Sequence, residues 1–264
     1  MTADLPRLVR FYRAVLGFEA RGDETPIDAA EMSLLGLSGR GRRRVLSLGA
    51  QVLSIDVFDE PGRPYPEHSD AASPWFQHLA LVVPDMQDAY ARLRDITPIT
   101  RGEPQRLPRS DGSVIAFKFR DPDRHPLELL QFPKGGAPEF WRSQAKRDGQ
   151  IGLGIGHSAI SVADADASAG FYRNLGLGAG DATLNRGPAQ ERLDGLSDVE
   201  VRVVPMHPPE QTTPHLELLG YGIPKVEAQR GLEANDVAAT RIVWDGQTAA
   251  VIVDPDGHLQ QVRA

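Results

Sequence analysis

The chain has 264 residues, 41% of them hydrophobic and 25% charged, which suits two domains of ordinary size or one domain built from two similar halves. Its net charge of −7 argues against a nucleic-acid binder, which normally presents a basic face. The absence of cysteine excludes disulfides and thiolate-bound zinc and is typical of a reducing, cytoplasmic compartment. No apolar run is long enough to span a bilayer, and no signal-peptide pattern is visible.

The first unit, about residues 1–58, begins with a predicted helix that Asp4 is placed to cap. Arginines then concentrate at 39–44, and we interpret this basic run as a solvated loop or turn rather than an anion site. The unit has no strand before its helix, and its last strand is expected around Ser54. Residues 59–73 connect it to the second unit.

The second unit, about 73–134, has the fuller pattern of a strand, a helix and further strands. The apolar, β-branched run at 78–83 ends at a proline and predicts a buried strand. Asp85 can cap a helix over 86–93, where apolar residues repeat at helical spacing. Two more strands are expected at 114–120 and 126–132, joined by turn residues. A Gly- and Pro-rich linker, 133–150, then separates the halves 1–134 and 151–264.

The third unit, about 151–222, repeats this order. A strand is predicted at 155–162, Asp164 caps a helix over 165–175, and further strands end with 214–221. The fourth unit, about 235–264, has strands at 239–244 and 247–253 with no helix between them. The two outer units are therefore truncated, and the two inner ones are complete.

Short motifs recur between the two halves. Three echoes are visible: Phe11-Tyr12-Arg13 and Phe171-Tyr172-Arg173, each followed by Leu-Gly; the seven-residue steps from His78 to Asp85 and from His157 to Asp164; and Asp121-Pro-Asp-Arg-His125 and Asp254-Pro-Asp-Gly-His258. The order and repetition of these motifs resemble the vicinal oxygen chelate superfamily of glyoxalases, bleomycin-resistance proteins and extradiol dioxygenases.

The resemblance implies an α+β fold of tandem βαβββ modules that form half-open, curved mixed β-sheets. In that superfamily two modules close around one divalent cation, with ligands on the first and last strands. These positions fall on His78, Glu128, His157 and Glu217, whereas the outer units offer only positions near Ser54 and Thr240, and Gln261. If unit two pairs with unit three in a crossed arrangement, the four inner residues make one site for Zn²⁺, Ni²⁺, Fe²⁺ or Mn²⁺. If each half closes on itself, neither half has a complete set.

Each of these residues also has a structural interpretation. A lone histidine beside an apolar strand is usually a core residue, and a strand glutamate can face solvent. The repetition favours a metal site for the inner four. His125 and His258 lie in turns and are expected to be structural, and His68 to be solvated. His215 and Tyr221 share a strand face with Glu217 and are candidates for substrate binding, although a bystander role is the simpler reading of His215.

The resemblance leaves three functions open for a small-molecule substrate. The first is a glyoxalase- or epimerase-like lyase or isomerase with a metal-stabilised enediolate, in which Glu128 or Glu217 moves the proton. The second is an extradiol ring-cleaving dioxygenase with Fe²⁺ or Mn²⁺. The third is a metal-free binder of an antibiotic or similar molecule, for which the aromatic content of 6% is low. The uncovered sheet edge of unit one suggests a homodimer.

Overall fold

Strand-rich units follow one another along the chain in the computed structural model, which describes residues 1–109, 112–209, 213–223 and 231–264. None of the helices in these ranges has the length and apolar character needed to cross a membrane. Unit one contains α1 (Leu5–Ala14), β1 (Glu19–Ala20), β2 (Thr25–Pro26), α2 (Ala29–Leu34), β3 (Gly41–Leu48) and β4 (Gln51–Phe58). Unit two contains β5 (Gln77–Val82), α3 (Met86–Arg92), β6 (Thr97–Pro98), β7 (Gln105–Arg109), β8 (Gly112–Arg120) and β9 (Pro126–Gln131).

A short helix, α4 (Glu139–Arg142), lies in the connection between the halves. Unit three contains β10 (Gly154–Val162), α5 (Ala165–Asn174), β11 (Gly178–Ala179), β12 (Thr183–Arg186), α6 (Pro188–Asp194), β13 (Glu200–His207) and β14 (His215–Ile223). Unit four contains β15 (Arg241–Asp245), β16 (Ala250–Val253) and β17 (Leu259–Arg263). The predicted capping residues are confirmed, because the carboxylates of Asp4, Asp85 and Asp164 accept hydrogen bonds from the first backbone N–H groups of α1, α3 and α5.

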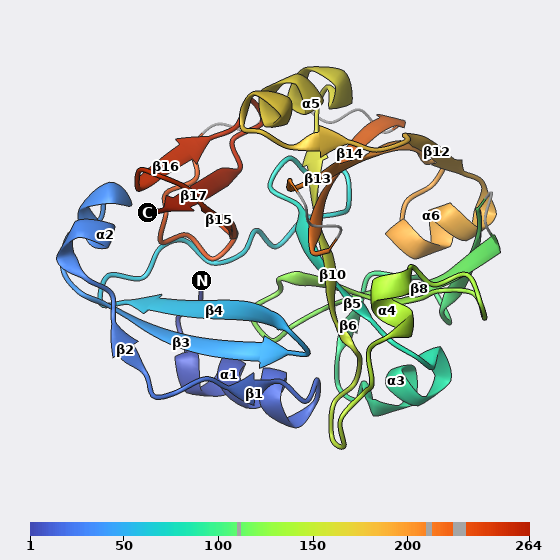
Figure 1. The fold of residues 1–264 in the computed structure, drawn as a ribbon, viewed down its shortest axis with the longest axis horizontal. Helices are drawn as coiled ribbons and strands as arrows, with labels where there is room; N and C mark the ends of the chain where they lie inside the picture. Colours follow the sequence, from blue (N-terminus) through green and yellow to red (C-terminus); the bar gives the residue numbers. More distant parts are fainter. Residues whose placement is uncertain (110–111, 210–212, 224–230) are drawn as a thin grey trace.

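Units two and three share one curved sheet of ten strands, here called the inner sheet. Its main order is β11-β13-β14-β10-β5-β9-β8-β6, with β12 on β13 and β7 on β8. The join between the units is the antiparallel pair β5–β10, which runs through the centre of the molecule (Figure 1). The crossed arrangement of units two and three is thereby confirmed, and the fold is the α+β, half-open curved sheet that the sequence predicts.

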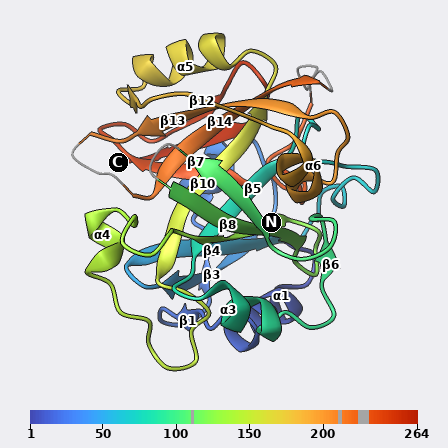
Figure 2. The same cartoon turned by 90° about the vertical axis from the view of Figure 1, so that its right-hand side faces the viewer.

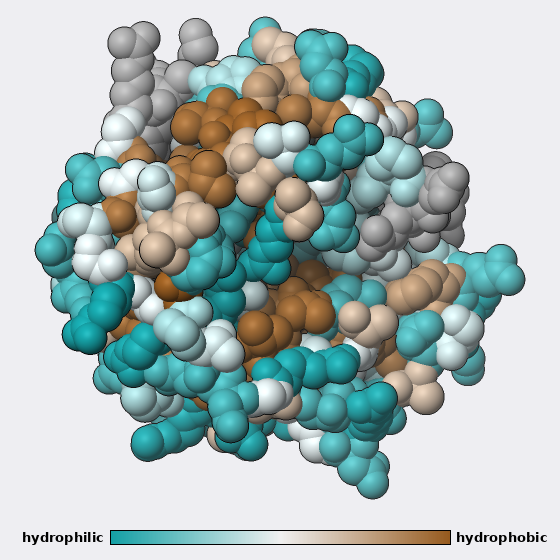
Figure 3. Space-filling model, turned by 60° about the vertical axis from the view of Figure 1, so that its left-hand side comes forward, coloured by the Kyte–Doolittle hydropathy of each residue, from teal (hydrophilic) through white to brown (hydrophobic). Residues whose placement is uncertain are grey.

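Units one and four form two smaller sheets, here called the outer sheets. One contains β1, β2, β3 and β4, and the other has the order β15-β17-β16. In Figure 1 they lie on the left, with β3 and β4 below the strands of unit four. Figure 3 views this face of the molecule, which is hollowed near its middle where hydrophilic side chains meet a hydrophobic patch.

The repeated motifs contact one another within each half. The hydroxyl of Tyr12 on α1 donates to Asp121 in the turn before β9, at 3.2 Å. In the second half the hydroxyl of Tyr172 on α5 donates to Asp254 at 2.7 Å. All four side chains are buried, so each bond satisfies polar atoms that water does not reach. The echoes therefore connect a helix of one unit to a turn of the next.

The expectation of a solvated loop at 39–44 is wrong for most of that run. Residues from Gly41 onward form β3, which pairs with β4 and places Arg43 opposite Asp56. The Arg43 side chain is only 11% exposed, and it donates to both Asp56 and Glu31. The loop interpretation considered only the number of charges, whereas two acidic partners compensate the largely buried guanidinium group of Arg43.

Candidate metal centre

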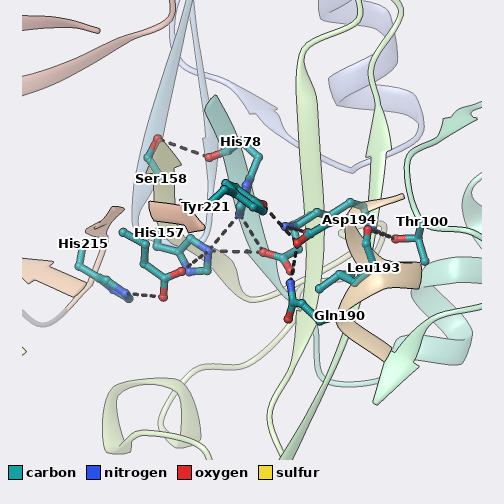
Figure 4. A network of polar contacts seen from close by, with 12 residues as sticks. His78, Thr100, His157, Ser158, Gln190, Leu193, Asp194, His215 and Tyr221 are labelled. Carbon is teal, nitrogen blue, oxygen red and sulfur yellow. Dashed lines mark hydrogen bonds and ion pairs between the residues drawn. The ribbon is translucent and has the colours of Figure 1, made fainter. Parts of the chain in front are cut away.

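Four predicted residues converge on the concave face of the inner sheet. His78 comes from β5, Glu128 from β9, His157 from β10 and Glu217 from β14. Figure 4 shows two of these side chains, His78 and His157, directed toward one another. These strands are neighbours in the order β14-β10-β5-β9, so both halves of the chain contribute to the cluster.

The register of the strands explains the convergence. Ala80 pairs with both Glu128 and His157, and Ala159 pairs with both His78 and Glu217. Residues in register on neighbouring strands share a face of the sheet. Each row therefore has a large polar side chain on either side of an alanine, and the small alanine leaves room above it for the two polar groups to approach.

The donor atoms of the cluster lie close together. His78 Nε2 is 2.9 Å from Glu128 Oε2 and 3.4 Å from His157 Nε2. His157 Nε2 is 3.4 Å from Glu128 Oε2 and 3.5 Å from Glu217 Oε2. Two overlapping groups of three residues have the geometry to hold a metal ion: His78, Glu128 and His157, and His157, His215 and Glu217.

These spacings fit a first-row divalent cation. Ligand atoms about 2.1 Å from zinc are about 3.4 Å apart in a tetrahedral site and about 3.0 Å apart in an octahedral one. The separations of 2.9 to 3.5 Å lie in that range. Two imidazole nitrogens that face each other across a carboxylate can also be satisfied together by one cation, so His78, Glu128 and His157 fit the group that the resemblance implies, and Glu217 adjoins them through His157.

Burial and charge set the protonation of the cluster. His78, Glu128 and His157 are each at most 5% exposed. Burial lowers the pKa of His78, which favours the neutral ring that a metal requires. Burial would raise the pKa of Glu128, but His78, His157 and Lys118 hold it well below its usual value. For His157, Glu217 and Glu128 outweigh burial and raise the pKa.

Glu217 differs from Glu128 in its surroundings. Its side chain is 20% exposed, against 7% for Glu128, so it lies on the more open side of the cluster. Its second oxygen, Oε1, is 3.4 Å from Nε2 of His215. Burial alone would raise its pKa, but the two neighbouring histidines, His157 first, lower the pKa of Glu217 to about 2.

The two residues predicted to bind substrate have different positions. His215 is near the cluster, with its ring centroid 5.3 Å from that of His157 and 4.9 Å from that of His207. Tyr221 is buried, and its hydroxyl donates to Asp194 of α6 at 3.2 Å. The hydroxyl hydrogen of Tyr221 is therefore donated within the protein.

Sequence reasoning missed a second buried charge pair beside the cluster. Lys118 on β8 donates to Asp194 at 2.7 Å, and both residues are buried. The signal was present, because a lysine in the middle of an apolar strand is as costly as a glutamate there. Asp194 closes α6, a helix that begins with Pro188 and ends before Gly195 in the left-handed conformation, and this pattern also went unused.

The remaining histidine predictions agree with the contacts. His125 bonds to Asp121 and to the carbonyl of Val237, and His258 bonds to the carbonyl of Ser161, so both turn histidines are structural. His68 is exposed.

The outer sheets contain charged groups of a different kind at the corresponding place. The polar centre of the outer sheets is not formed by Ser54 and Thr240. It is formed by Asp56 and Arg241, which follow them by two positions and one position in the chain. Arg241 donates to Asp56 at 2.6 Å, and Arg43 donates to the same carboxylate at 2.7 and 2.8 Å. Gln261, the third predicted position, donates to Glu31 of α2 at 2.6 Å. We call these five residues the outer ion-pair cluster: Glu31, Arg43, Asp56, Arg241 and Gln261.

Comparisons with known proteins place this site in context. Residues 1–129 match the family model "Glyoxalase/Bleomycin resistance protein/Dioxygenase superfamily". The crystal structure of glyoxalase I from Zea mays is 18% identical, with a TM-score of 0.56 over 99% of this chain and 88% of that one. A "putative dioxygenase" from Bacillus subtilis is 13% identical, with a TM-score of 0.57 over 97% of this chain and 80% of that one. Curated proteins give no match. At these identities the structural likeness concerns the fold.

Proposed function

Since residues 1–129 match the model of the Glyoxalase/Bleomycin resistance protein/Dioxygenase superfamily, we propose that the chain is an enzyme of that superfamily that depends on a divalent metal. The ligands in this proposal are His78, Glu128, His157 and Glu217. The observation that carries it is the meeting of two imidazoles and two carboxylates, within 3.5 Å of a neighbour, at the seam between units two and three. A set of two nitrogens and two oxygens suits Zn²⁺, Ni²⁺, Fe²⁺ or Mn²⁺.

The reaction class in this proposal is that of a lyase or isomerase acting on a small, oxygen-rich molecule. A bound divalent cation would supply Lewis-acid polarisation of a substrate carbonyl. Glu217 is the better placed of the two carboxylates to move a proton, because it is the more exposed one and His215 holds its free oxygen. Glu128 is more deeply buried between His78 and His157, which favours a role as a fixed ligand.

An extradiol dioxygenase is the second candidate, and one observation favours it. His78, Glu128 and His157 alone form a two-histidine, one-carboxylate group, the set that typically holds Fe²⁺ for oxygen chemistry. Consumption of dioxygen with a catechol by the iron-loaded protein would identify this activity. Its absence, together with proton exchange next to the carbonyl of a small hydroxy-ketone, supports the isomerase.

The proposal extends to location and assembly. We propose a small-molecule partner, a cytoplasmic location, from the cysteine-free sequence, and a homodimer through the open edge of the outer sheets. Light scattering of the purified protein tests the dimer.

Elemental analysis of the purified chain tests the metal directly. We expect about one transition-metal ion per chain, as one four-ligand site predicts, and a His78→Ala/His157→Ala variant that retains none. His68→Ala is the matched control, because this exposed histidine lies in a loop outside the cluster. A wild-type protein that takes up no ion even after incubation with Zn²⁺, Ni²⁺, Fe²⁺ or Mn²⁺ would leave a metal-free small-molecule binder as the function.

A further inference from the structure

Lys118 is buried in the row of residues that carries the proposed metal ligands. Its side chain is 5% exposed, comparable with 7% for Glu128 and 6% for His157. In the register of the inner sheet, Lys118 on β8 pairs with Glu128 on β9. Cross-strand neighbours have Cβ atoms about 5 Å apart and share a face, so Lys118 lies beside Glu128 on the face of the cluster.

The ammonium group interacts electrostatically with the whole cluster. Its positive charge contributes to lowering the pKa values of His78 and Glu128 and opposes the rise at His157. Burial would lower the pKa of Lys118 itself, but Asp194, Glu128 and Glu217 raise it, so the side chain remains charged. Through its 2.7 Å ion pair with Asp194, Lys118 thus adds a buried cation to the inner site besides the metal that the site is proposed to bind.

Asp194 fixes the position of the Lys118 ammonium group but accepts only one of its N–H donors in the hydrogen bonds of the described residues. An ammonium group has three N–H donors, and among the hydrogen bonds of the described residues Asp194 Oδ1 accepts one. The other oxygen of Asp194 accepts from Gln190 at 2.7 Å and from Tyr221 at 3.2 Å (Figure 4). The carboxylate is therefore itself fixed, and it holds Lys118 in place while donors remain for another oxygen.

Anchoring of α6 alone is a weaker explanation for the lysine. Leu193 already packs α6 against an apolar group on the neighbouring strands, and Thr100 donates to its backbone carbonyl at 3.1 Å. Figure 2 shows the side of the molecule on which α6, β7 and β8 lie. A buried ion pair is costly to form, and an apolar pair of similar volume is often as stable. The positive charge of Lys118 therefore indicates a role in binding at the inner site.

We propose that Lys118 binds an anionic oxygen of the substrate, and that the substrates of the inner site are small 2-hydroxy or 2-oxo acids. A metal held by the proposed ligands would supply Lewis-acid polarisation of the 2-oxygen, and a carboxylate oxygen of the substrate accepts a hydrogen bond from Lys118. The inference rests on the proposed function, because it requires an ion held by His78, Glu128, His157 and Glu217.

A matched pair of probes isolates the contribution of Lys118. Lactate and lactamide have nearly the same shape, but only lactate is charged at pH 7. Isothermal titration calorimetry would measure both with zinc-loaded wild-type protein and with Lys118→Met, after elemental analysis has verified one zinc per chain in each. The metal's own preference for lactate is present in both proteins and cancels from the comparison.

We expect Lys118→Met to weaken lactate binding about tenfold, as for the loss of one hydrogen bond to a charged group, and to leave lactamide binding nearly unchanged. Lys118→Arg should retain the preference for lactate. Should Lys118→Met fail to fold, Lys118→Gln, which keeps a polar side chain, takes its place.

Two results would overturn the inference. One is an affinity of Lys118→Met for lactate, and for lactamide, equal to that of the wild type. The other is an equal loss for both probes with a lower melting temperature, which indicates a structural role in anchoring α6. Failure of the proposed function is seen separately, because the wild-type protein would then contain no zinc at the first step.

Discussion

The inner sheet and the outer sheets contain buried acids and compensate them in opposite ways. In the inner sheet, Glu128 and Glu217 face His78 and His157, whose rings are uncharged in a metal-binding state. In the outer ion-pair cluster, the two acids face guanidinium groups that are always charged, those of Arg43 and Arg241. Both regions belong to the same repeated architecture, so the difference arises from a handful of side chains.

The comparison explains which region can accept a cation. Arg43 and Arg241 neutralise Asp56 and Glu31 within the protein, so a further positive ion would be repelled. The inner acids have imidazoles as direct partners, and in the metal-binding state, where both rings are neutral, the acids retain negative charge that a divalent ion can offset. The outer cluster therefore links units one and four by ion pairs, and the inner cluster has the charge that the proposed metal site requires.

The largest expected effect separates the regions by metal affinity. Removal of one imidazole with His78→Ala should weaken zinc binding by more than about a hundredfold. Mutation of a residue that only hydrogen-bonds to a metal ligand costs about 10- to 100-fold, and loss of the ligand itself should cost more. Gln261→Ala, at the corresponding outer position, should leave the affinity unchanged. Competition with a fluorescent zinc chelator measures both. Equal losses in the two variants would contradict the division between the regions.

A change in the outer cluster should act on stability instead. Asp56→Asn leaves Arg43 and Arg241 without their shared carboxylate, which should cost about 3 to 5 kcal/mol of unfolding free energy. Zinc stoichiometry should remain that of the wild type. Urea denaturation and elemental analysis on the same sample test both statements.

The stability lost in Asp56→Asn should depend on pH, in a direction set by the pKa shift of Asp56. Burial opposes ionisation, but Arg43 and Arg241 lower the pKa of Asp56 below its usual value. A depressed folded-state pKa contributes stability above the unfolded pKa of about 4, and this contribution is lost as pH falls through the folded value. The difference between wild type and Asp56→Asn should thus be largest near pH 7 and smaller at pH 3. A difference that widens in acid would show that the carboxylate is not stabilised by the two arginines.

Metal removal should lower stability only where the inner site is intact. At free zinc a hundred times above the dissociation constant, binding adds about 2.7 kcal/mol to the unfolding free energy. A chelator should remove that increment from the wild type and from Asp56→Asn, and have no effect on His78→Ala/His157→Ala. Thermal unfolding with and without chelator measures this, and a chelator response in the double variant would place the ion elsewhere.

The smallest effects compare the two tyrosine-to-aspartate bonds. Tyr172→Phe and Tyr12→Phe should each cost about 1 kcal/mol. The loss should be greater for Tyr172, because its hydroxyl donates to Asp254 at 2.7 Å and accepts from Gln260 at 2.9 Å, whereas Tyr12 contacts Asp121 at 3.2 Å. Urea denaturation of both variants gives the order, and the reverse order would contradict it.

Most elements could be predicted from the sequence because their signals are local. Asp85 and Asp164 precede runs of helical spacing, and both cap helices as expected. The candidate ligands were proposed for a different reason: the repeated motifs resemble a known superfamily, and the step from His78 to Asp85 recurs at His157, so the superfamily's ligand positions could be located in both inner units.

The missed residues depend on partners that are distant in sequence. Lys118 and Asp194 are 76 positions apart, and Arg241 and Asp56 are 185 apart. Alternation along a strand shows which residues share a face, but it does not identify the neighbour across the sheet. A buried lysine or arginine in an apolar strand is therefore visible as an anomaly before its partner can be named.

The seam between β5 and β10 has a consequence for how the protein would acquire the proposed metal. Each half of the chain contributes one histidine and one glutamate, so a half that folds alone holds only two of the four donors. A nascent chain would acquire full affinity only after its C-terminal half has docked. Ion uptake would then report completed assembly, and the two halves produced as separate polypeptides would bind zinc tightly only when mixed.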